Sequence, residues 1–123
     1  IIITQRNELA QYIATGQAVD AKVSEVLLEA LFFKNSPLHD GAVIVTGDNI
    51  RAARCILPVS NKATIPPSYG RRHRAAVGIT EKSDAIAIVV SEERGEIAYA
   101  VEGILHAHVS PSDLSTFLEG LGK

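Results

Sequence analysis

An uninterrupted apolar run at residues 85–90, Ala-Ile-Ala-Ile-Val-Val, limits the possible folds of this chain more than any other segment. Most of its residues are β-branched and both of its alternating faces are apolar, which favours a strand that is buried on each side. Such a strand needs packed elements against both faces of its sheet. We therefore expect residues 85–90 to form the centre of a sheet in a layered fold.

Further strands are predicted from β-branched runs and from the turn residues between them. Residues 42–46 and 50–57 flank a Gly-Asp-Asn sequence typical of a tight hairpin, so we expect them to pair antiparallel. Residues 1–4 and 97–101 indicate two more strands. The predicted fold class is α/β, with a mixed, mainly antiparallel central sheet and helices packed on both faces.

Four segments place apolar residues at helical spacing, namely residues 7–14, 25–33, 72–80 and 112–121. Ser24 is the predicted N-cap of the second segment, because its hydroxyl can accept a hydrogen bond from the first turn. These helices would supply the layers that cover the sheet.

The size of the chain bounds its organisation. Its 123 residues, 46% of them apolar, suit one compact domain with a single core, so we expect one domain over residues 1–123. The abrupt β-branched start predicts that the domain is truncated at its amino-terminal end. The chain contains no apolar run near the roughly 20 residues that cross a bilayer and no signal-peptide pattern.

Charge and cysteine content argue against nucleic-acid binding, internal disulfides and a zinc knuckle. The formal net charge is −2, so no general positive field would hold a nucleic acid by counterion release. Cys55 is the only cysteine and has no partner for an internal disulfide or a zinc knuckle. We interpret it as a buried strand thiol in a reducing, cytoplasmic setting.

The first candidate functional cluster is His39, Asp40, Gly41 and Ala42, directly before and at the start of a predicted strand. Gly41 would let a phosphate approach the backbone closely. Asp40 could bind a divalent metal or accept a proton from a hydroxyl nucleophile, the tasks that nucleotidyl transfer requires. An ordinary turn entering a strand is the alternative interpretation.

The second cluster is Gly70, Arg71, Arg72, His73 and Arg74, a local concentration of cationic and titratable residues in a slightly acidic chain. Arginine forks bind phosphate oxygens at two points, and the start of a helix adds N–H groups aimed the same way. The cluster therefore predicts a polyphosphate site, and a solvated basic face is the alternative.

The third cluster, Ser91, Glu92 and Glu93, ends the predicted buried strand, at the rim where open sheets bind ligands. Glu93 could complete a site for Mg²⁺ or Mn²⁺ with His39 and Asp40, since oxygen ligands and one imidazole suit these ions. A charged turn is the alternative here.

These clusters, in their order and spacing, resemble the signature motifs of the diadenylate cyclase domain family. The similarity extends over nearly the whole chain and is strongest to the membrane-anchored type of that family. The residues that show it are His39-Asp40-Gly41-Ala42, Arg72-His73-Arg74 and Ser91-Glu92-Glu93.

The resemblance implies an activity and its partners. A member of this family condenses two ATP molecules into cyclic di-AMP, a second messenger, with release of pyrophosphate. It does so as a face-to-face homodimer that uses Mn²⁺ or Mg²⁺. The type further implies a cytoplasmic domain whose parent protein is anchored in the bacterial cell membrane by an upstream segment and has regulatory protein partners.

The resemblance also implies a role for each matching residue. Catalytic residues would be Asp40, Gly41, Ala42, Arg72, His73 and Arg74. ATP would contact Leu57, Gly70, Arg71, Arg72, His73, Arg74 and Ser91. The metal ligands would be His39, Asp40 and Glu93.

Two positions depart from the family pattern. Ile56 stands where an aromatic residue is often found, and Arg71 stands where a small hydroxyl residue is common. Weaker stacking on the adenine base is the expected result of the first change. Two other function classes would use similar anion and metal sites: a nucleotide-sensing module that binds ATP or cyclic di-AMP without turnover, and a metal-dependent nucleotide phosphohydrolase.

Overall fold

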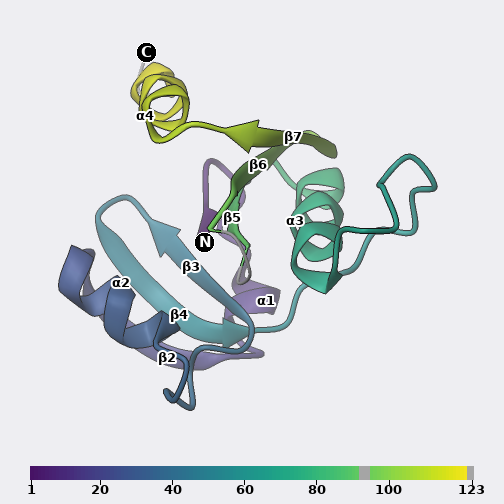
Figure 1. Cartoon of the computed structure of the whole chain (residues 1–123). Coiled ribbons are helices and arrows are strands. Elements are labelled where there is room, and N and C mark those ends of the chain that lie inside the picture. Colours follow the sequence, from purple (N-terminus) through teal and green to yellow (C-terminus); the bar gives the residue numbers. More distant parts are fainter. Residues whose placement is uncertain (92–94, 122–123) are drawn as a thin grey trace.

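A computed structural model describes residues 1–91 and 95–121. Within them the chain forms seven strands and four helices (Figure 1). The strands are β1 (Ile2–Ile3), β2 (Gln17–Lys22), β3 (Ala42–Thr46), β4 (Asn49–Cys55), β5 (Ile86–Val90), β6 (Ile97–Val101) and β7 (Ile104–Val109). The helices are α1 (Ala10–Ile13), α2 (Glu25–Phe32), α3 (Arg71–Lys82) and α4 (Pro111–Gly120).

All seven strands form one sheet in the order β2-β4-β3-β1-β5-β6-β7. Only the β1 and β3 pair is parallel, and the other pairs are antiparallel. The predicted mixed, mainly antiparallel sheet is therefore confirmed. The short strand β1 inserts between β3 and β5 and occupies the middle of the sheet. The prediction that residues 85–90 form the centre was therefore wrong by one strand, since β5 lies next to the central strand.

Side chains alternate along the strands and build a core on each face of the sheet. On β3, Ile44 packs into the core beneath α3, together with Val77 and Ile79 of that helix. Val43 and Val45 point the other way, into the core that α2 covers. Figure 1 shows α2 and α3 on opposite sides of the strands, which confirms the prediction of helices on both faces.

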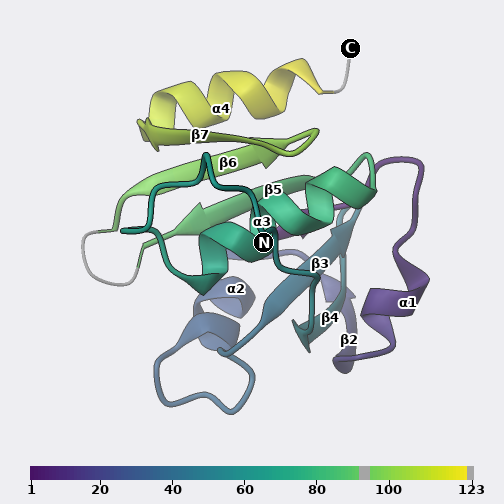
Figure 2. The same ribbon diagram turned by 90° about the vertical axis from the view of Figure 1, so that its right-hand side faces the viewer.

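Helix α4 covers the far end of the sheet, along β7, as Figure 2 shows. Tyr99 of β6 stacks on Phe117 of α4 with ring centroids 4.1 Å apart, and on His106 of β7 at 4.7 Å. Its strand neighbour Ala100 belongs to the core on the α3 side. The stacked rings therefore place α4 on the face opposite α3.

A side-chain cap decides where α2 begins, and a left-handed residue decides where α1 begins. The predicted N-cap Ser24 is confirmed, since its Oγ accepts a hydrogen bond of 3.1 Å from the backbone N–H of Leu27. The first helix is shorter than the predicted 7–14, because Leu9 has a left-handed backbone with φ of 58° and helical geometry begins only at Ala10.

Strand β2 was not predicted from the sequence. It pairs only with β4, at one edge of the sheet, and most of its side chains are exposed. An edge strand with solvent on both faces lacks the apolar alternation that identifies a strand. A bulge at Asp20, where φ is 51°, interrupts the pattern further.

The position of α3 depends on a close main-chain contact at Gly78. A Cβ at this position would lie 2.1 Å from the carbonyl oxygen of Pro58 and 3.0 Å from the backbone nitrogen of Ser60. The backbone N–H of Ser60 also donates to the carbonyl of Arg74 at 2.9 Å. These contacts hold α3 against the segment that follows β4.

Within the described ranges, 1–91 and 95–121, no helix has the length and apolar content needed to cross a membrane.

Gly78→Ala is predicted to lower the free energy of unfolding by about 1–3 kcal/mol, because a methyl group would overlap the Pro58 main chain and push α3 outward. Urea denaturation followed by circular dichroism would measure the change. Gly120→Ala is the matched control, since no neighbouring atom lies within 4 Å of its added Cβ. Equal stability of the two variants would contradict the proposed close contact.

Candidate functional site

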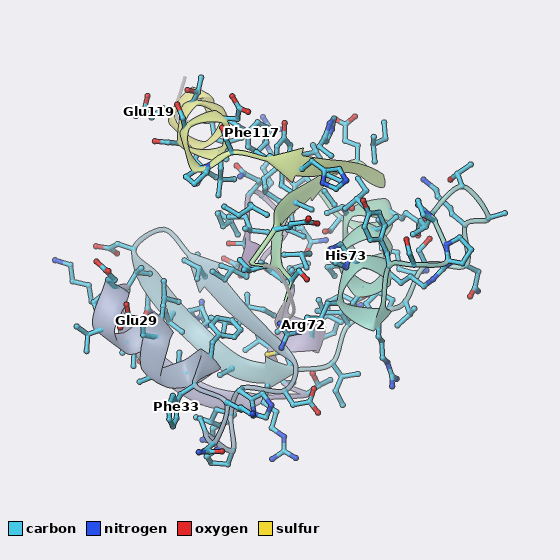
Figure 3. The ribbon with its side chains drawn as sticks, viewed as in Figure 1. Glu29, Phe33, Arg72, His73, Phe117 and Glu119 are labelled. Carbon is cyan, nitrogen blue, oxygen red and sulfur yellow. The ribbon has the colours of Figure 1, made fainter. Side chains whose placement is uncertain are left out.

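An open groove of about 1600 Å³ lies at one edge of the sheet, where β1 and β3 begin and β4 and β5 end. Its walls come from α2 and the loop before β3, from the end of β4, and from the first turns of α3. Residues far apart in the sequence meet there because these neighbouring strands all start or end at this edge. Figure 3 shows Arg72 reaching from α3 toward the space between α3 and α2.

The loop before β3 is organised around Ser36. The Ser36 carbonyl accepts hydrogen bonds from the backbone N–H of His39 at 3.3 Å and from its ring Nδ1 at 2.8 Å. The Ser36 hydroxyl accepts from the N–H of Leu38 at 3.1 Å. These bonds fix the imidazole of His39 against the Ser36 carbonyl, and both His39 and the exposed Asp40 that follows it line the groove.

Gly41 is required by its backbone geometry. Its φ is 116°, a value that other residues rarely adopt, and an added Cβ would lie 2.8 Å from the Cα of Arg54 on β4. Ala42 follows and pairs with Cys55 in the β3–β4 ladder. Asp40 and Gly41 are thus held at the mouth of the groove by direct packing against β4.

Arg71 and Arg72 open α3 and line the groove opposite the 38–42 segment. Gly70 is the N-cap without a side-chain cap, and the first turn contains no acidic residue. Backbone N–H groups at a helix start and two guanidinium groups together favour an anion. Arg72 Nη1 donates to the carbonyl of Val90 at 3.3 Å, which places this guanidinium beside Ser91.

Arg74 and His73 point elsewhere, and neither is among the residues that line the groove. The Arg74 guanidinium donates to the carbonyls of Ser60, Lys62 and Ile65 at 3.2, 3.3 and 3.4 Å. It therefore holds the 60–65 loop to α3.

The His73 ring stacks on Tyr69, with centroids 4.6 Å apart. Burial, and then the neighbouring Arg72 guanidinium, lower the pKa of the His73 imidazole, which favours the neutral ring at pH 7.

The structure thus sorts the predicted site residues into three groups. Those that line the common groove are His39, Asp40, Gly41, Ala42, Leu57, Arg71, Arg72 and Ser91. Those that do not line it are Gly70, His73 and Arg74. Glu93 lies outside the described residues. The roles in catalysis, ATP binding and metal binding remain predictions for every member.

Sequence reasoning overlooked Arg54, which also lines the groove. This arginine lies in the segment at residues 50–57, which the sequence predicts as a regular strand. In the structure its backbone is left-handed, with φ of 57°, at a register shift between β3 and β4. A charged residue in an otherwise apolar strand is the only signal in the sequence, and Arg51 in the same segment shares it.

Cys55 lies at the base of the groove and is only 1% exposed, which confirms the predicted buried strand thiol. Burial raises the pKa of its thiol to about 11. A thiol that stays protonated at neutral pH is a poor nucleophile, so Cys55 contributes packing.

The described ranges contain no group of three His, Cys, Asp or Glu side chains arranged to hold a metal ion. Two of the three predicted ligands, His39 and Asp40, are neighbours in the sequence and both line the groove. The predicted third ligand, Glu93, falls in the gap between the described ranges.

Several curated proteins are similar to this chain. A diadenylate cyclase, CdaS, from Bacillus thuringiensis is 46% identical over 107 residues, which are 86% of this chain and 53% of that protein. The cyclic di-AMP synthase CdaA from Bacillus subtilis is 44% identical over 119 residues, 97% of this chain and 44% of that protein. The chain thus spans about half the length of these relatives.

Two solved structures share the fold. The crystal structure of a DacA double mutant from Staphylococcus aureus superposes with a TM-score of 0.94 at 43% identity, covering 97% of this chain and 79% of that chain. A hypothetical membrane spanning protein from Bacillus cereus superposes with a TM-score of 0.80 at 42% identity, covering 89% of this chain and 54% of the other.

A family model supports the same relationship at the level of the domain. The model of the DAC domain, described as DisA bacterial checkpoint controller nucleotide-binding, matches residues 1–105, a range that includes every groove residue described above. The match agrees with the resemblance of the three motifs and with the superposition on DacA. On this evidence the chain belongs to the DAC family of diadenylate cyclase domains.

Proposed function

We propose that this chain is the catalytic domain of a diadenylate cyclase, which joins two ATP molecules into cyclic di-AMP and releases two pyrophosphates. The observation that carries the proposal is that Asp40, from the loop before β3, and Arg72, from the start of α3, line one groove. The relatives named diadenylate cyclase and cyclic di-AMP synthase support the same reaction.

The reaction assigns a task to each wall of the groove. The 3′-oxygen of one ATP attacks the α-phosphorus of the other, and the bond from that phosphorus to the oxygen bridging toward the β-phosphorus breaks. Pyrophosphate leaves, and the proton of the 3′-hydroxyl passes to the carboxylate of Asp40. A second, identical step closes the ring. Arg71 and Arg72 bind the polyphosphate and hold it in line for the attack.

Ser91 and Leu57 would complete the nucleotide site. Both line the groove, at the ends of β5 and β4. Ser91 directly follows Val90, whose carbonyl accepts from Arg72, and a serine hydroxyl suits a phosphate oxygen. Leu57 would contact the adenine mainly through its backbone, since its side chain packs into the core.

The side chains of His39 and Asp40 carry atoms that can coordinate a divalent cation. A carbonyl only accepts hydrogen bonds, so the contact of His39 with the Ser36 carbonyl places the proton on Nδ1 and leaves the Nε2 lone pair available. We propose that His39 and Asp40 hold Mn²⁺ or Mg²⁺, with Glu93 as a further ligand. A nucleotide and water would supply the remaining oxygen ligands. The bound ion would offset negative charge on the phosphate oxygens.

A homodimer is proposed from the shape and the rim of the groove. Its volume of about 1600 Å³ exceeds the roughly 300–1,000 Å³ usual for a small-molecule pocket, so one nucleotide leaves part of it uncovered. Ile56, Val59 and Val90 line it and are 69%, 40% and 46% exposed. Exposed apolar side chains beside an open site suit a second copy of the domain, which would bring the second ATP.

We also propose that the domain works in the cytoplasm as part of a longer protein anchored in the bacterial cell membrane and open to regulatory protein partners. The match to a hypothetical membrane spanning protein supports the anchor. The half-length coverage of the curated relatives is consistent with additional segments in the parent protein.

Incubation of the chain with ATP and Mn²⁺ is expected to yield cyclic di-AMP and pyrophosphate, separated by chromatography. Because two copies must meet, the rate per subunit should fall when the protein is diluted below its dimer dissociation constant. Unreacted ATP at every metal and protein concentration would indicate a sensing module. ADP or AMP formed at a concentration-independent rate per subunit would indicate a phosphohydrolase.

Asp40→Asn is expected to reduce turnover by at least about 100-fold, because the amide cannot accept the 3′-hydroxyl proton. The affinity for ATP should change little, since the phosphate-binding arginines remain. Asp48→Asn, in the β3–β4 hairpin, is the matched control and should retain the wild-type rate. Near-normal turnover by Asp40→Asn would remove this carboxylate from the mechanism.

Arg72→Ala and Arg74→Ala are expected to differ. The first should raise the dissociation constant for ATP about 10-fold, because a charge-assisted phosphate contact is lost. The second should lower the free energy of unfolding by about 1–3 kcal/mol, because three backbone carbonyls lose their donor. Calorimetric titration and urea denaturation would separate the two effects. Weaker ATP binding by Arg74→Ala at unchanged stability would instead support direct contact with the triphosphate.

A further inference from the structure

Arg54 has no assigned role in the reaction described above. Resting on the proposed function, we propose that Arg54 is a further substrate-binding residue, whose guanidinium binds a phosphate oxygen of the nucleotide held in the groove. The inference starts from its place on the groove wall, at a backbone irregularity of β4 directly against Gly41.

The backbone at Arg54 departs from that of an ordinary strand. Its φ of 57° is left-handed, which is unfavourable for an arginine, and the β3–β4 register shifts across this position. Gly41 opposite has a φ of 116° and approaches the Arg54 Cα so closely that a Cβ would lie 2.8 Å away. Bulges of this kind re-aim a side chain and are frequent beside active sites.

The side chain of Arg54 is exposed and, in the described part of the chain, makes no hydrogen bond or ion pair. Other arginines near α3 have protein contacts: Arg74 donates to three backbone carbonyls, and Arg72 donates to the carbonyl of Val90. The five N–H donors of the Arg54 fork are therefore available to a ligand.

The charges on the groove wall indicate what that ligand is. Within the described residues, four cationic side chains line the groove, against two carboxylates, although the whole chain has a net charge of −2. The cationic residues are Lys34, Arg54, Arg71 and Arg72, and the carboxylates are Glu29 and Asp40. Among these described side chains the positive charges outnumber the negative ones, which favours an anionic ligand.

The location of Arg54 indicates that it binds the phosphates of the nucleotide rather than the base or the ribose. Gly41 is in direct contact with the main chain of Arg54, and Asp40 precedes Gly41, so Arg54 lies beside the segment that carries the proposed proton acceptor. Arg71 and Arg72 line the same groove from another element, the start of α3. A phosphoryl group between the walls would be bound from both sides, which suits a group whose negative charge grows during transfer.

The test compares Arg54→Asn with the control Arg51→Asn, which lies on the same strand but does not line the groove. Asparagine tolerates the left-handed backbone, so neither the fold nor the bulge should be lost, and thermal unfolding would check this. Titration calorimetry would use ATP, inorganic tripolyphosphate and adenosine. Arg54→Asn should bind ATP and tripolyphosphate about 10-fold more weakly, with unchanged affinity for adenosine. Arg51→Asn should match the wild type.

Arg54→Lys should recover part of the lost affinity, because it restores the charge without the two-point fork. Should Arg54→Asn fail to fold, Arg54→Gly, which also suits a positive φ, would take its place. ATP and tripolyphosphate affinities within two-fold of the wild type would overturn the inference. If the wild-type chain binds ATP but forms no cyclic di-AMP, the proposed function is wrong. The Arg54 inference is still tested in that case, because it is measured by binding.

Discussion

The main-chain contact between Gly78 and Pro58 is the constraint on which the site depends. A helix with any side chain at this position would stand further from the segment that follows β4. The hydrogen bonds from Arg74 to the carbonyls of the 60–65 loop hold the same interface from the other side. Together they fix the start of α3, and with it Arg71 and Arg72, over the edge of the sheet.

A second glycine, Gly41, performs the same task on the opposite wall. Its contact with the backbone of Arg54 brings the end of the 38–41 loop against β4, so that Asp40 emerges at the mouth of the groove. Each wall of the candidate site is therefore positioned by a glycine, at a point where two main chains approach so closely that no side chain fits between them. Rigid backbone contacts of this kind suit a reaction that depends mainly on alignment.

The arginines divide into structural and ligand-facing groups in a way that the motif alone does not reveal. Arg72 and Arg74 belong to one short sequence, yet a difference of two residues on a helix turns their side chains apart. Arg72 faces the groove, whereas Arg74 ties a loop to the helix. Arg54 joins the groove from another strand, so the positive wall combines residues from two parts of the chain.

The buried strand at residues 85–90, the cap at Ser24, the hairpin and the three motifs could be identified from the sequence, because each depends on local propensity or on a continuous pattern. The folded chain was needed to show that β1 lies at the centre, that β2 forms an edge, and that Arg54 rather than Arg74 lines the groove. Those outcomes depend on strand pairing, on a bulge and on main-chain contacts between distant segments. Such contacts leave no periodic signal in a single sequence, because their energy arises only when the segments meet.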